Sequence, residues 1–363
     1  MRAPDISVIM ATYNHASFVK EAMESVLSQQ GVNIEFIIAD DGSTDTTREV
    51  IAAIADPRIS YFPSEVNRGA CIVTNELIAR SRGKYIALIN SDDSWIPGKL
   101  RYQFDYMETN PSVGLSFGRA RFMDRDGVLI SKEALSFGTV FDQDNRTAGR
   151  WLRRFFSDGN CICHPTMLIR REVYEKVGLY SNHLRQLPDL DMWIRIIKEY
   201  DLHISDRELI NYRILPGENA SSQTSGNAIR TINEHYLIAE TVFDGVSRER
   251  MIEGFDDILV IKNIPSDVHL EIEKTLLYFH SNQWLWRPYK MVGLPRMRRL
   301  LSSVSHRKVL SEDYGIDDHW FHDEMSKMDV LLPPRMRPDS VRHHTMGVLR
   351  AVWRRISGTR PAY

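Results

Sequence analysis

Three apolar runs in the first hundred residues set the strongest constraint on how this chain can fold. The runs "ISVIMA" (6–11), "IEFIIA" (34–39) and "YIALI" (85–89) are continuously hydrophobic and rich in isoleucine. Runs of this kind are typical of strands that are covered on both faces. Because helical patterns separate them, they predict strand–helix–strand units around a parallel sheet with right-handed crossovers.

The helical patterns between and after these runs suggest how the chain is organised. Thr46 and Glu49 have the spacing of a capping box, which predicts a helix start at this point. Further along, Asp126-Gly127 indicates a hairpin, and "LHISDRELINYRI" (202–214) reads as two short strands. Past about residue 225 the pattern is mostly helical. We therefore expect an α/β domain over residues 1–225 and a mostly helical extension over 226–363.

Each apolar run ends in a cluster of polar residues. The first run leads into Thr12-Tyr13-Asn14, the second into Asp40-Asp41, and the third into Asn90-Ser91-Asp92-Asp93. The carboxyl ends of parallel strands meet at one edge of a sheet, and ligands of open α/β sheets bind beyond that edge. The three clusters are therefore expected to converge on one crevice.

The adjacent carboxylates Asp92 and Asp93 are the clearest chemical signal. Hard cations such as Mg²⁺ and Mn²⁺ are often held by one or two carboxylates, with substrate phosphates completing the shell. The pair thus predicts half of a cation site that would bind a diphosphate. Asp40 could accept hydrogen bonds from a base or a ribose, and Arg68 could reach pyrophosphate or ribose. The alternative is an ordinary solvated turn at Asp92-Asp93, and a turn plus helix cap in "DDGSTD" (40–45).

Composition narrows the class of protein. A hydrophobic content of 43% with 26% charged residues is ordinary for a soluble globular chain. Three cysteines, Cys71, Cys161 and Cys163, cannot supply a disulfide framework for this length, which favours a reducing compartment. The sequence shows neither a signal peptide nor an apolar run of membrane-spanning length. We expect a cytoplasmic protein.

Charge is distributed unevenly near the C-terminus. Residues 284–309 carry seven basic residues and no acid, and residues 335–363 carry seven arginines against Asp339 alone. Together with Trp284, Trp286 and Trp353, these segments suit an interfacial helix on anionic lipid, at the inner face of a membrane. A solvated helix face is the alternative. Nucleic acid is not an expected partner, because no recognition motif is present.

Several segments together resemble a family 2 glycosyltransferase of the GT-A fold. The resemblance covers about residues 5–215 and is carried by "ISVIMATYNHASFVKEAMESVLSQQ", "IEFIIADDGSTDTT", "NRGACIVTNELIARSRGKYIALINSDDSW" and "PDLDMWIRI". It implies a mostly parallel Rossmann-like sheet flanked by helices. It also implies inverting transfer of one sugar from a nucleotide diphospho-sugar, with UDP-sugar favoured, to a glycan or lipid-linked acceptor. Mg²⁺ or Mn²⁺ is the implied cofactor, and cell-surface polysaccharide biosynthesis the implied setting.

The resemblance also implies roles for individual residues. Those placed at the nucleotide-sugar are Thr12, Tyr13, Asn14, Asp40, Asp41, Asn67, Arg68, Gly69, Asn75, Asn90, Ser91 and Asp92. Asp92 and Asp93 are the implied metal ligands. Asn90 stands where many members of the family have a first aspartate, so the ribose contact at this position departs from the family pattern.

Asp189 aligns with the acidic residue that the family uses as general base. Pro188 replaces a glutamate found in many members, but one carboxylate is sufficient to take the acceptor proton. Helix N-capping is the alternative role for Asp189 and Asp191, and Asp191 is expected to be structural. His164, Asp191 and Trp193 are assigned to the acceptor side. A metal site of His164 with Cys161 and Cys163 is not favoured, since no second ligand pair accompanies them.

Two other functions fit parts of the sequence. A sugar-1-phosphate nucleotidyltransferase shares the α/β setting, although the Gly-rich phosphate loop and lysine of such enzymes are absent near residues 6–20. A catalytically inactive nucleotide-sugar-binding relative is the second alternative. "QWLWR" (283–287) resembles the Gln-x-x-Arg-Trp signature of processive synthases in the wrong order, so non-processive transfer is expected.

Overall fold

A computed structural model describes residues 3–218, 224–280 and 285–328 of the chain. These residues form two compact units, one ending at Val292 and the other beginning at Gly293. The predicted domain boundary at residues 225/226 marks where the described chain becomes entirely helical, and as a domain boundary it stays a prediction. The basic segment 335–363 and Trp353 lie outside the described residues, as does Trp284.

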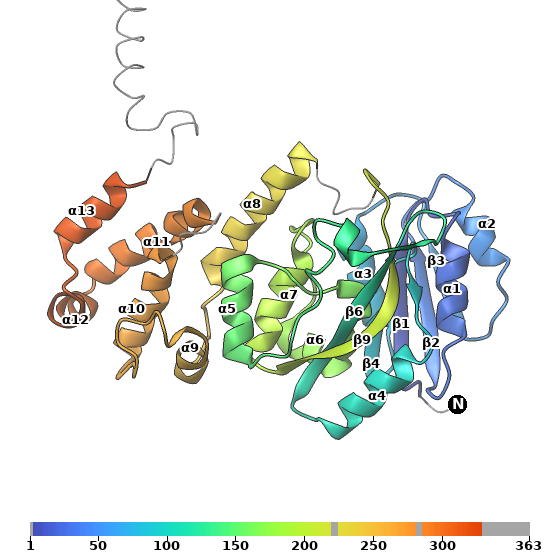
Figure 1. The fold of residues 1–363 in the computed structure, drawn as a ribbon, viewed down its shortest axis with the longest axis horizontal. Helices are drawn as coiled ribbons and strands as arrows, with labels where there is room; N and C mark the ends of the chain where they lie inside the picture. The colour runs from blue at the N-terminus through green and yellow to red at the C-terminus, as the bar shows by residue number, and fades with distance from the viewer. Residues whose placement is uncertain (1–2, 219–223, 281–284, 329–363) are drawn as a thin grey trace, which may run out of the picture. The chain divides into compact units, whose positions relative to one another are not determined.

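The strands of the described residues form one mixed sheet (Figure 1). Their order is β3-β2-β1-β4-β8-β6-β9-β5, and β7 pairs with β6. Their bounds are β1 Ile6–Thr12, β2 Ile34–Asp40, β3 Ile59–Pro63, β4 Tyr85–Leu88, β5 Ser94–Trp95, β6 Val113–Met123, β7 Leu129–Ile130, β8 Leu168–Arg170 and β9 Asp201–Arg213.

The first four strands make the parallel part of the sheet. β1 pairs in parallel with both β2 and β4, and β2 pairs in parallel with β3. The remaining pairs are antiparallel except for β6 with β9. The predicted α/β class is therefore confirmed, with the expected parallel sheet extended by a mixed half. Strand β3 at the edge was not among the predicted strands.

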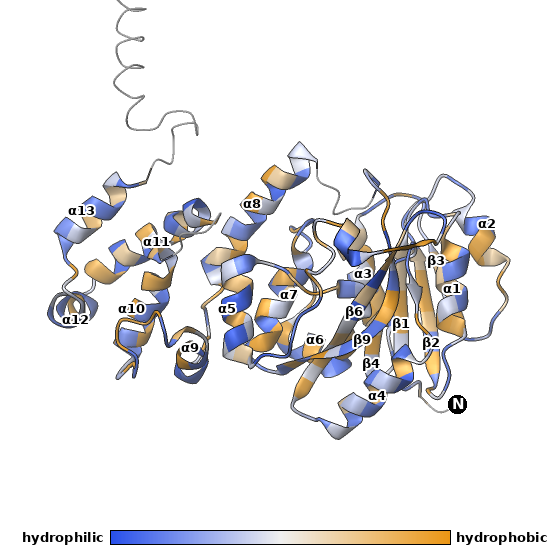
Figure 2. Cartoon of the chain, in the orientation of Figure 1, coloured by the Kyte–Doolittle hydropathy of each residue, from blue (hydrophilic) through white to orange (hydrophobic). Residues whose placement is uncertain are grey.

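Side chains alternate between two apolar cores, one on each face of the sheet. Ile6, Val8 and Met10 of β1 belong to the core under α1, α2 and α4, whereas Ile9 belongs to the core under α3, α5, α6 and α7. Figure 2 shows hydrophobic residues along these strands. The bounds are α1 Val19–Leu27, α2 Thr47–Ala52, α3 Ala70–Arg80, α4 Lys99–Thr109, α5 Ala148–Asp158, α6 Arg171–Val177 and α7 Pro188–Ile197. Covering both faces explains the uninterrupted apolar runs of the sequence.

The helix start predicted at Thr46 is confirmed, but two local details differ from the prediction. Thr46 is the N-cap residue of α2, and its side chain makes no capping bond. Instead Oδ1 of Asp45, the residue just before Thr46, accepts from the backbone N–H of Thr47 at 3.0 Å. Asp45 therefore binds an N–H group at the start of the helix. The segment 202–214 is one strand, β9, and not two. The middle of β9 is irregular, and its pairing with β6 shifts register near Phe117 and Arg119.

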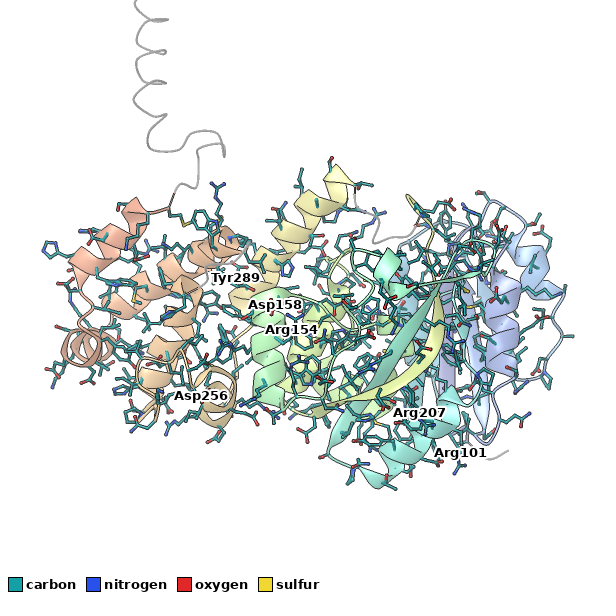
Figure 3. All side chains as sticks on the ribbon, viewed as in Figure 1. Arg101, Arg154, Asp158, Arg207, Asp256 and Tyr289 are labelled. Carbon is teal, nitrogen blue, oxygen red and sulfur yellow. The ribbon has the colours of Figure 1, made fainter. Side chains whose placement is uncertain are left out.

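The helical part of the first unit continues the core of the sheet. It contains α8 Ser225–Thr241, α9 Arg248–Phe255, α10 Asp267–Leu276 and the start of α11, Trp286–Leu301. The hydroxyl of Tyr278 donates to the carbonyl of Ala239 at 2.6 Å. The rings of Phe156 on α5 and Tyr289 stack with centroids 4.3 Å apart, and Figure 3 labels Tyr289 near the α5 residues Arg154 and Asp158.

Helices α5 and α9 approach closely through two glycines. A Cβ atom on Gly149 would lie 2.5 Å from the carbonyl oxygen of Arg250, and one on Gly254 would overlap the carbonyl of Gly149. The carboxylate of Glu253 also accepts from the N–H of Gly149 at 2.7 Å. Because neither glycine has a side chain, the two helix backbones can touch.

The second unit consists of the rest of α11 together with α12 Val304–Tyr314 and α13 Asp318–Ser326. An ion pair joins Arg307 of α12 to Asp318 of α13. Among the described helices, none has the length and apolar character needed to cross a membrane.

Candidate active site

The three polar clusters meet at the carboxyl edge of the parallel strands, as predicted. Thr12 and Asp40 are partners in the register of β1 and β2. The N–H of Asp41 donates to the carbonyl of Thr12 at 2.8 Å. On the other side of β1, Nδ1 of His15 lies 2.7 Å from Oγ of Ser91, which precedes the aspartate pair. The sheet thus gathers residues of three separate loops into one site.

The loops after β1 and β2 are bonded to each other. Asn14 has a left-handed backbone, with φ of 54°, and its side-chain oxygen accepts from the N–H of Thr44 at 2.8 Å. The N–H of Asn14 in turn donates to Oγ of Ser43 at 2.9 Å. Tyr13, next to this turn, is 43% exposed. The phenol ring is therefore free to meet a ligand in the site.

Asp40 is a buried carboxylate with one satisfied and one unsatisfied oxygen. Oδ1 accepts from the N–H groups of Gly42 and Ser43 at 3.2 and 2.9 Å, and Nε of Arg48 lies 3.3 Å away. Oδ2 is buried and has no hydrogen-bond partner among the described residues, and the same holds for Oγ1 of Thr12. Buried polar atoms in this state are expected to bind a ligand or water, because leaving them unpaired is unfavourable.

The segment 67–69 is fixed against the loop after β2. Both oxygens of Asp41 accept backbone N–H groups, from Arg68 and Gly69, each at 2.8 Å. Gly42 has φ of +82°, and a Cβ there would lie 2.7 Å from the backbone nitrogen of Asn67. The Arg68 guanidinium forms an ion pair with Glu76 at 2.5 Å. The Asp41 side chain thus holds the segment 67–69 by binding its backbone N–H groups.

Asn75 on α3 holds a different part of the chain. Its side-chain amide donates to the carbonyl of Tyr180 at 2.8 Å, and its oxygen accepts the N–H of Tyr180 at 3.0 Å. The same amide donates to Asn182 at 3.0 Å. The predicted role of Asn75 at the nucleotide stays a prediction, and its contacts in the structure fix the loop before α7.

The aspartate pair after β4 is buried. Oδ2 of Asp93 accepts from the Asn90 amide at 3.0 Å, and Oδ1 accepts from the N–H of Arg213 at 2.8 Å. Nε of Arg213 donates to the carbonyl of Asp92 at 2.8 Å. Burial, followed by the neighbouring charge of Asp92, raises the pKa of Asp93 well above its usual range.

This donor set fits a hard cation as a half-site. Two carboxylates confined together repel each other, and a bound cation would relieve that repulsion. Among the described residues, no group of three or more His, Cys, Asp or Glu side chains is placed to hold a metal ion. The pair therefore suits a cation that takes its other oxygen ligands from a bound phosphate or water.

Asp189 lies in the first turn of α7. Oδ1 accepts from the N–H of Leu190 at 2.8 Å, and Oδ2 accepts from the Asn160 amide at 2.5 Å. Burial raises the pKa of Asp189 to about 6, the bonds from Leu190 and Asn160 act in the opposite direction, and the charge of Glu234 raises it further. The N-cap residue of α7 is Leu187, without a side-chain cap. The N-capping alternative for Asp189 is therefore wrong.

The segment around Cys163 is near both acidic centres. The Cys163 thiol interacts electrostatically with both Asp93 and Asp189, and burial raises its pKa well above the usual range. The indole N–H of Trp95 donates to the carbonyl of Pro165 at 3.4 Å. The structure thus brings the predicted base into the neighbourhood of the predicted metal ligands.

The three predicted acceptor-side residues differ in their surroundings. Nε2 of His164 lies 2.8 Å from the Tyr180 hydroxyl, and burial lowers the His164 pKa to about 4, so the ring is neutral at pH 7. Trp193 is fully buried against Phe117 and His164, and it can affect an acceptor only through its neighbours. Asp191 pairs with Arg195 at 2.9 Å, as expected for a structural residue.

Sequence reasoning missed three residues of the site. Arg213 at the end of β9 is buried, donates to the carbonyls of Asp92, Asp124 and Arg125, and pairs with Glu21. Asn160 orients Asp189, and Glu234 lies beneath the loop that precedes it. Arg213 is the last residue of a strand, where a basic residue is ordinary, and no motif marks Asn160 or Glu234.

Comparisons with known proteins agree with this geometry. The profile described as glycosyl transferase family 2 matches residues 7–178. An uncharacterized glycosyltransferase of Methanocaldococcus jannaschii is 32% identical over 228 residues, covering 61% of this chain and 75% of the relative. A putative teichuronic acid biosynthesis glycosyltransferase of Bacillus subtilis is 29% identical, covering 61% and 83%.

Solved structures share the fold. The chain matches residues 1–349 of TarS from S. aureus, in complex with UDP-GlcNAc, with a TM-score of 0.55 and 15% identity, over 89% of this chain and 91% of that one. It matches a mannosyltransferase from Pyrobaculum calidifontis, in complex with GDP-Man and Mn²⁺, with a TM-score of 0.52 and 14% identity, over 90% and 87%.

Proposed function

The chain belongs to glycosyl transferase family 2 and is a glycosyltransferase, and from this premise we propose that it transfers one sugar, with inversion, from a nucleotide diphospho-sugar to a hydroxyl group. The observation that carries the proposal is the buried pair of Asp92 and Asp93 after β4, at the same edge of the sheet as Asp40 of β2, with β1 between the two strands. The transfer is non-processive.

The donor nucleoside binds at the ends of β1 and β2. The free Oδ2 of Asp40 can only accept a hydrogen bond, so it pairs with an N–H group of the base, and we assign it to the ring N–H of uracil. Thymine and guanine have a ring N–H of the same kind, whereas cytosine and adenine could offer only an exocyclic amino group. A UDP-sugar is the favoured donor, supported by the UDP-GlcNAc complex of the similar TarS structure. Tyr13 and Asn14 line the same pocket, with Asn67, Arg68 and Gly69 beside the nucleotide.

Asp92 and Asp93 would hold Mg²⁺ or Mn²⁺ together with the donor diphosphate. When bound, the cation stabilises the negative charge of the departing diphosphate. The residues of the chain prepare this site. Arg213 fixes the carbonyl of Asp92 and one oxygen of Asp93, and Asn90 orients the other oxygen of Asp93. Ser91 is held by His15 from the neighbouring loop.

Asp189 acts as the general base. Inverting transfer needs a group that removes the proton of the acceptor hydroxyl as the sugar carbon is attacked opposite the diphosphate. With a pKa of about 6, Asp189 is mostly ionised at pH 7, yet it is basic enough to take a proton. Asn160 holds Oδ2 of Asp189 in one orientation. His164 is neutral and lines the acceptor side of the site.

The acceptor is a glycan or a lipid-linked saccharide of a cell-surface polysaccharide. This part of the proposal is supported by relatives named for teichuronic acid and, in Escherichia coli, colanic acid biosynthesis. The protein acts in the cytoplasm or peripherally at the inner face of the membrane. Contact with anionic lipid would come from the basic segments after residue 284, which the structure describes only in part.

A thermal-shift comparison of UDP, GDP, dTDP and CMP, each with and without Mn²⁺, tests the donor site. A ligand that binds the native state stabilises it by mass action, by about 2.7 kcal/mol at one hundred times its Kd, and so raises the melting temperature. We expect a Mn²⁺-dependent shift with UDP that is lost with EDTA. The shift should also be lost in Asp92→Asn and Asp93→Asn, but kept in Asp105→Asn, a surface acid on α4.

Two outcomes would contradict the proposal. If no nucleotide diphosphate gives a metal-dependent shift, the aspartate pair is not a donor site. If Asp189→Asn binds UDP with Mn²⁺ normally and still transfers sugar, the base is a different group. An inactive nucleotide-sugar-binding relative would give the UDP shift without any transfer by the wild-type protein.

A further inference from the structure

Glu234 is a buried carboxylate that the proposed reaction does not use. It lies in the middle of α8 and is 3% exposed. A carboxylate is rarely buried in this way unless its oxygens are hydrogen-bonded, because removing it from water is strongly unfavourable. Its position is also outside the segment 7–178 that matches the family profile. The contacts of Glu234 explain why the chain retains an acid there.

Both oxygens of Glu234 accept backbone N–H groups from the loop before α7. Oε1 accepts from Arg185 at 2.9 Å, and Oε2 accepts from Gln186 and Leu187, each at 2.8 Å. Hydrogen bonds to an ionised acceptor are roughly twice as strong as neutral ones. Three of them on successive residues fix the backbone of this segment.

The segment that Glu234 fixes leads directly into Asp189. Leu187 is the N-cap residue of α7, its side chain provides no cap, and Pro188 has no N–H to donate. A negative charge at the start of a helix also interacts favourably with the helix dipole. Glu234 therefore holds the backbone just before the helix, ending two residues before the proposed base.

Other contacts hold the same loop and the same helix. Cys71 and Asn75 of α3 bond to Leu184 and Tyr180, on the side of the loop that leads away from α6. At the other end of α7, Lys198 donates to the carbonyl of Thr241 at the end of α8 at 3.0 Å. Helix α8 thus contacts both ends of α7.

We propose that Glu234 is a positioning residue for the glycosyl transfer. Through the N–H groups of residues 185–187 it fixes the position of the Asp189 carboxylate, and it adds a negative charge nearby. This inference rests on the proposed function, in which Asp189 is the base. The groups that interact electrostatically with Asp189 are Cys71, Cys163, Tyr180 and Glu234. Burial raises the pKa values of the two thiols and the phenol, so these three are neutral at pH 7. Glu234 supplies the charge.

The test compares Glu234→Gln with Glu240→Gln, a matched change at an exposed acid on the same helix, in the full-length protein. Hydrogen exchange of residues 185–187 is expected to accelerate about tenfold or more in Glu234→Gln, because charge-assisted bonds to these amides are lost. Carbon-13 NMR of the aspartate carboxyls, with Asp189 assigned from Asp189→Asn, should show its titration midpoint moving to lower pH. Glu240→Gln should change neither.

A merely structural role would lower the melting temperature without moving the Asp189 midpoint, and that result would overturn the inference. Glu234→Asp is the milder variant if Glu234→Gln folds poorly: its charge remains, so the midpoint should stay near that of the wild type, while the three amides still exchange faster. Failure of the proposed function looks different. In that case Asp189→Asn retains sugar transfer, whatever Glu234 does to the titration.

Discussion

The side-chain amide of Asn160 lies 2.5 Å from Oδ2 of Asp189, while its own oxygen accepts from the N–H of Ile162 at 3.1 Å. The second bond fixes which end of the amide faces Asp189, so Asn160 is a donor to the proposed base. A donor of this kind stabilises the ionised carboxylate and opposes the rise in pKa caused by burial.

Replacing Asn160 by alanine is therefore expected to raise the pKa of Asp189 above about 6. The transfer rate depends on the ionised base, so the acid limb of the pH–rate profile should move to higher pH, with a loss of activity at pH 7. The loss should shrink as the pH rises. A loss that is the same at every pH would mean that Asn160 acts only on structure.

The Asp189→Asn variant should be more stable than the wild-type protein at high pH. The pKa is about 6 in the folded state against 3.8 for the ordinary group, so folding favours the protonated carboxyl. The ionised form therefore reduces stability above pH 6, and this penalty disappears as pH falls toward 4. Each pKa unit corresponds to about 1.4 kcal/mol, and Asp189 is partly exposed, so we expect a gain of about 1–2 kcal/mol at pH 8.

Chemical denaturation of the two proteins at pH 8 and pH 4 measures this difference. The gain should be small at pH 4, where the wild-type carboxyl is already protonated. An equal gain at both values of pH would show that burial does not shift the Asp189 pKa.

Arg213→Met should destabilise the protein and weaken metal-dependent donor binding. The buried guanidinium donates to three backbone carbonyls and pairs with the half-exposed Glu21. Leaving these acceptors unpaired should reduce the free energy of unfolding by about 3 kcal/mol.

Arg207→Met on the same strand is the control, since Arg207 (labelled in Figure 3) lies over the Tyr102 ring at the surface. Urea unfolding of both variants measures the free energy of unfolding, and equal losses of stability would contradict the role of Arg213.

Gly254→Ala should loosen the contact between α5 and α9. The new methyl group would overlap the carbonyl of Gly149, so the helices must separate. We expect a loss of about 1–3 kcal/mol, although alanine favours a helix by about 1 kcal/mol. Gly226→Ala in α8 is the matched control, because its methyl group meets nothing within 4 Å. That variant should gain stability, and a similar gain in Gly254→Ala would contradict the close approach.

Asp40→Asn should change the preferred base of the nucleotide. Oδ1 of Asp40 is held by the N–H groups of Gly42 and Ser43, so an asparagine would keep its oxygen there and place its NH₂ where Oδ2 now lies. A donor in that position repels the ring N–H of uracil and matches N3 of cytosine. Calorimetry should show UDP binding weakened about 10- to 100-fold and the ratio of CDP to UDP affinity increased. Unchanged UDP binding would place the base elsewhere.

The fold was largely predictable because its signals are local. Continuous apolar runs and polar strand ends gave the parallel strands and the edge where their loops meet. Strand β3 was harder, since it is short, partly exposed and ends at Pro63. The capping bond is absent at Thr46, and Asp45, one residue earlier, instead binds the N–H of Thr47 at the start of the helix.

The contacts that refine the site were not predictable. Arg213 reaches Asp92 from 121 residues away, and Glu234 reaches Leu187 from 47 residues away. Neither is marked by its neighbours, because a basic residue at the end of a strand and an acid in a helix are ordinary. Their importance comes from burial, and burial is a property of the assembled fold.

The contact between Glu234 and the loop before α7 also has a consequence for biosynthesis. During translation the strands of the described sheet are complete once Arg213 has left the ribosome, yet the N–H groups of residues 185–187 still lack the carboxylate that binds them. The nascent chain can therefore form its donor pocket before it can fix its proposed base. On the proposed function, a chain that ends before α8 would keep the loops of the strand ends but lack the carboxylate that positions Asp189.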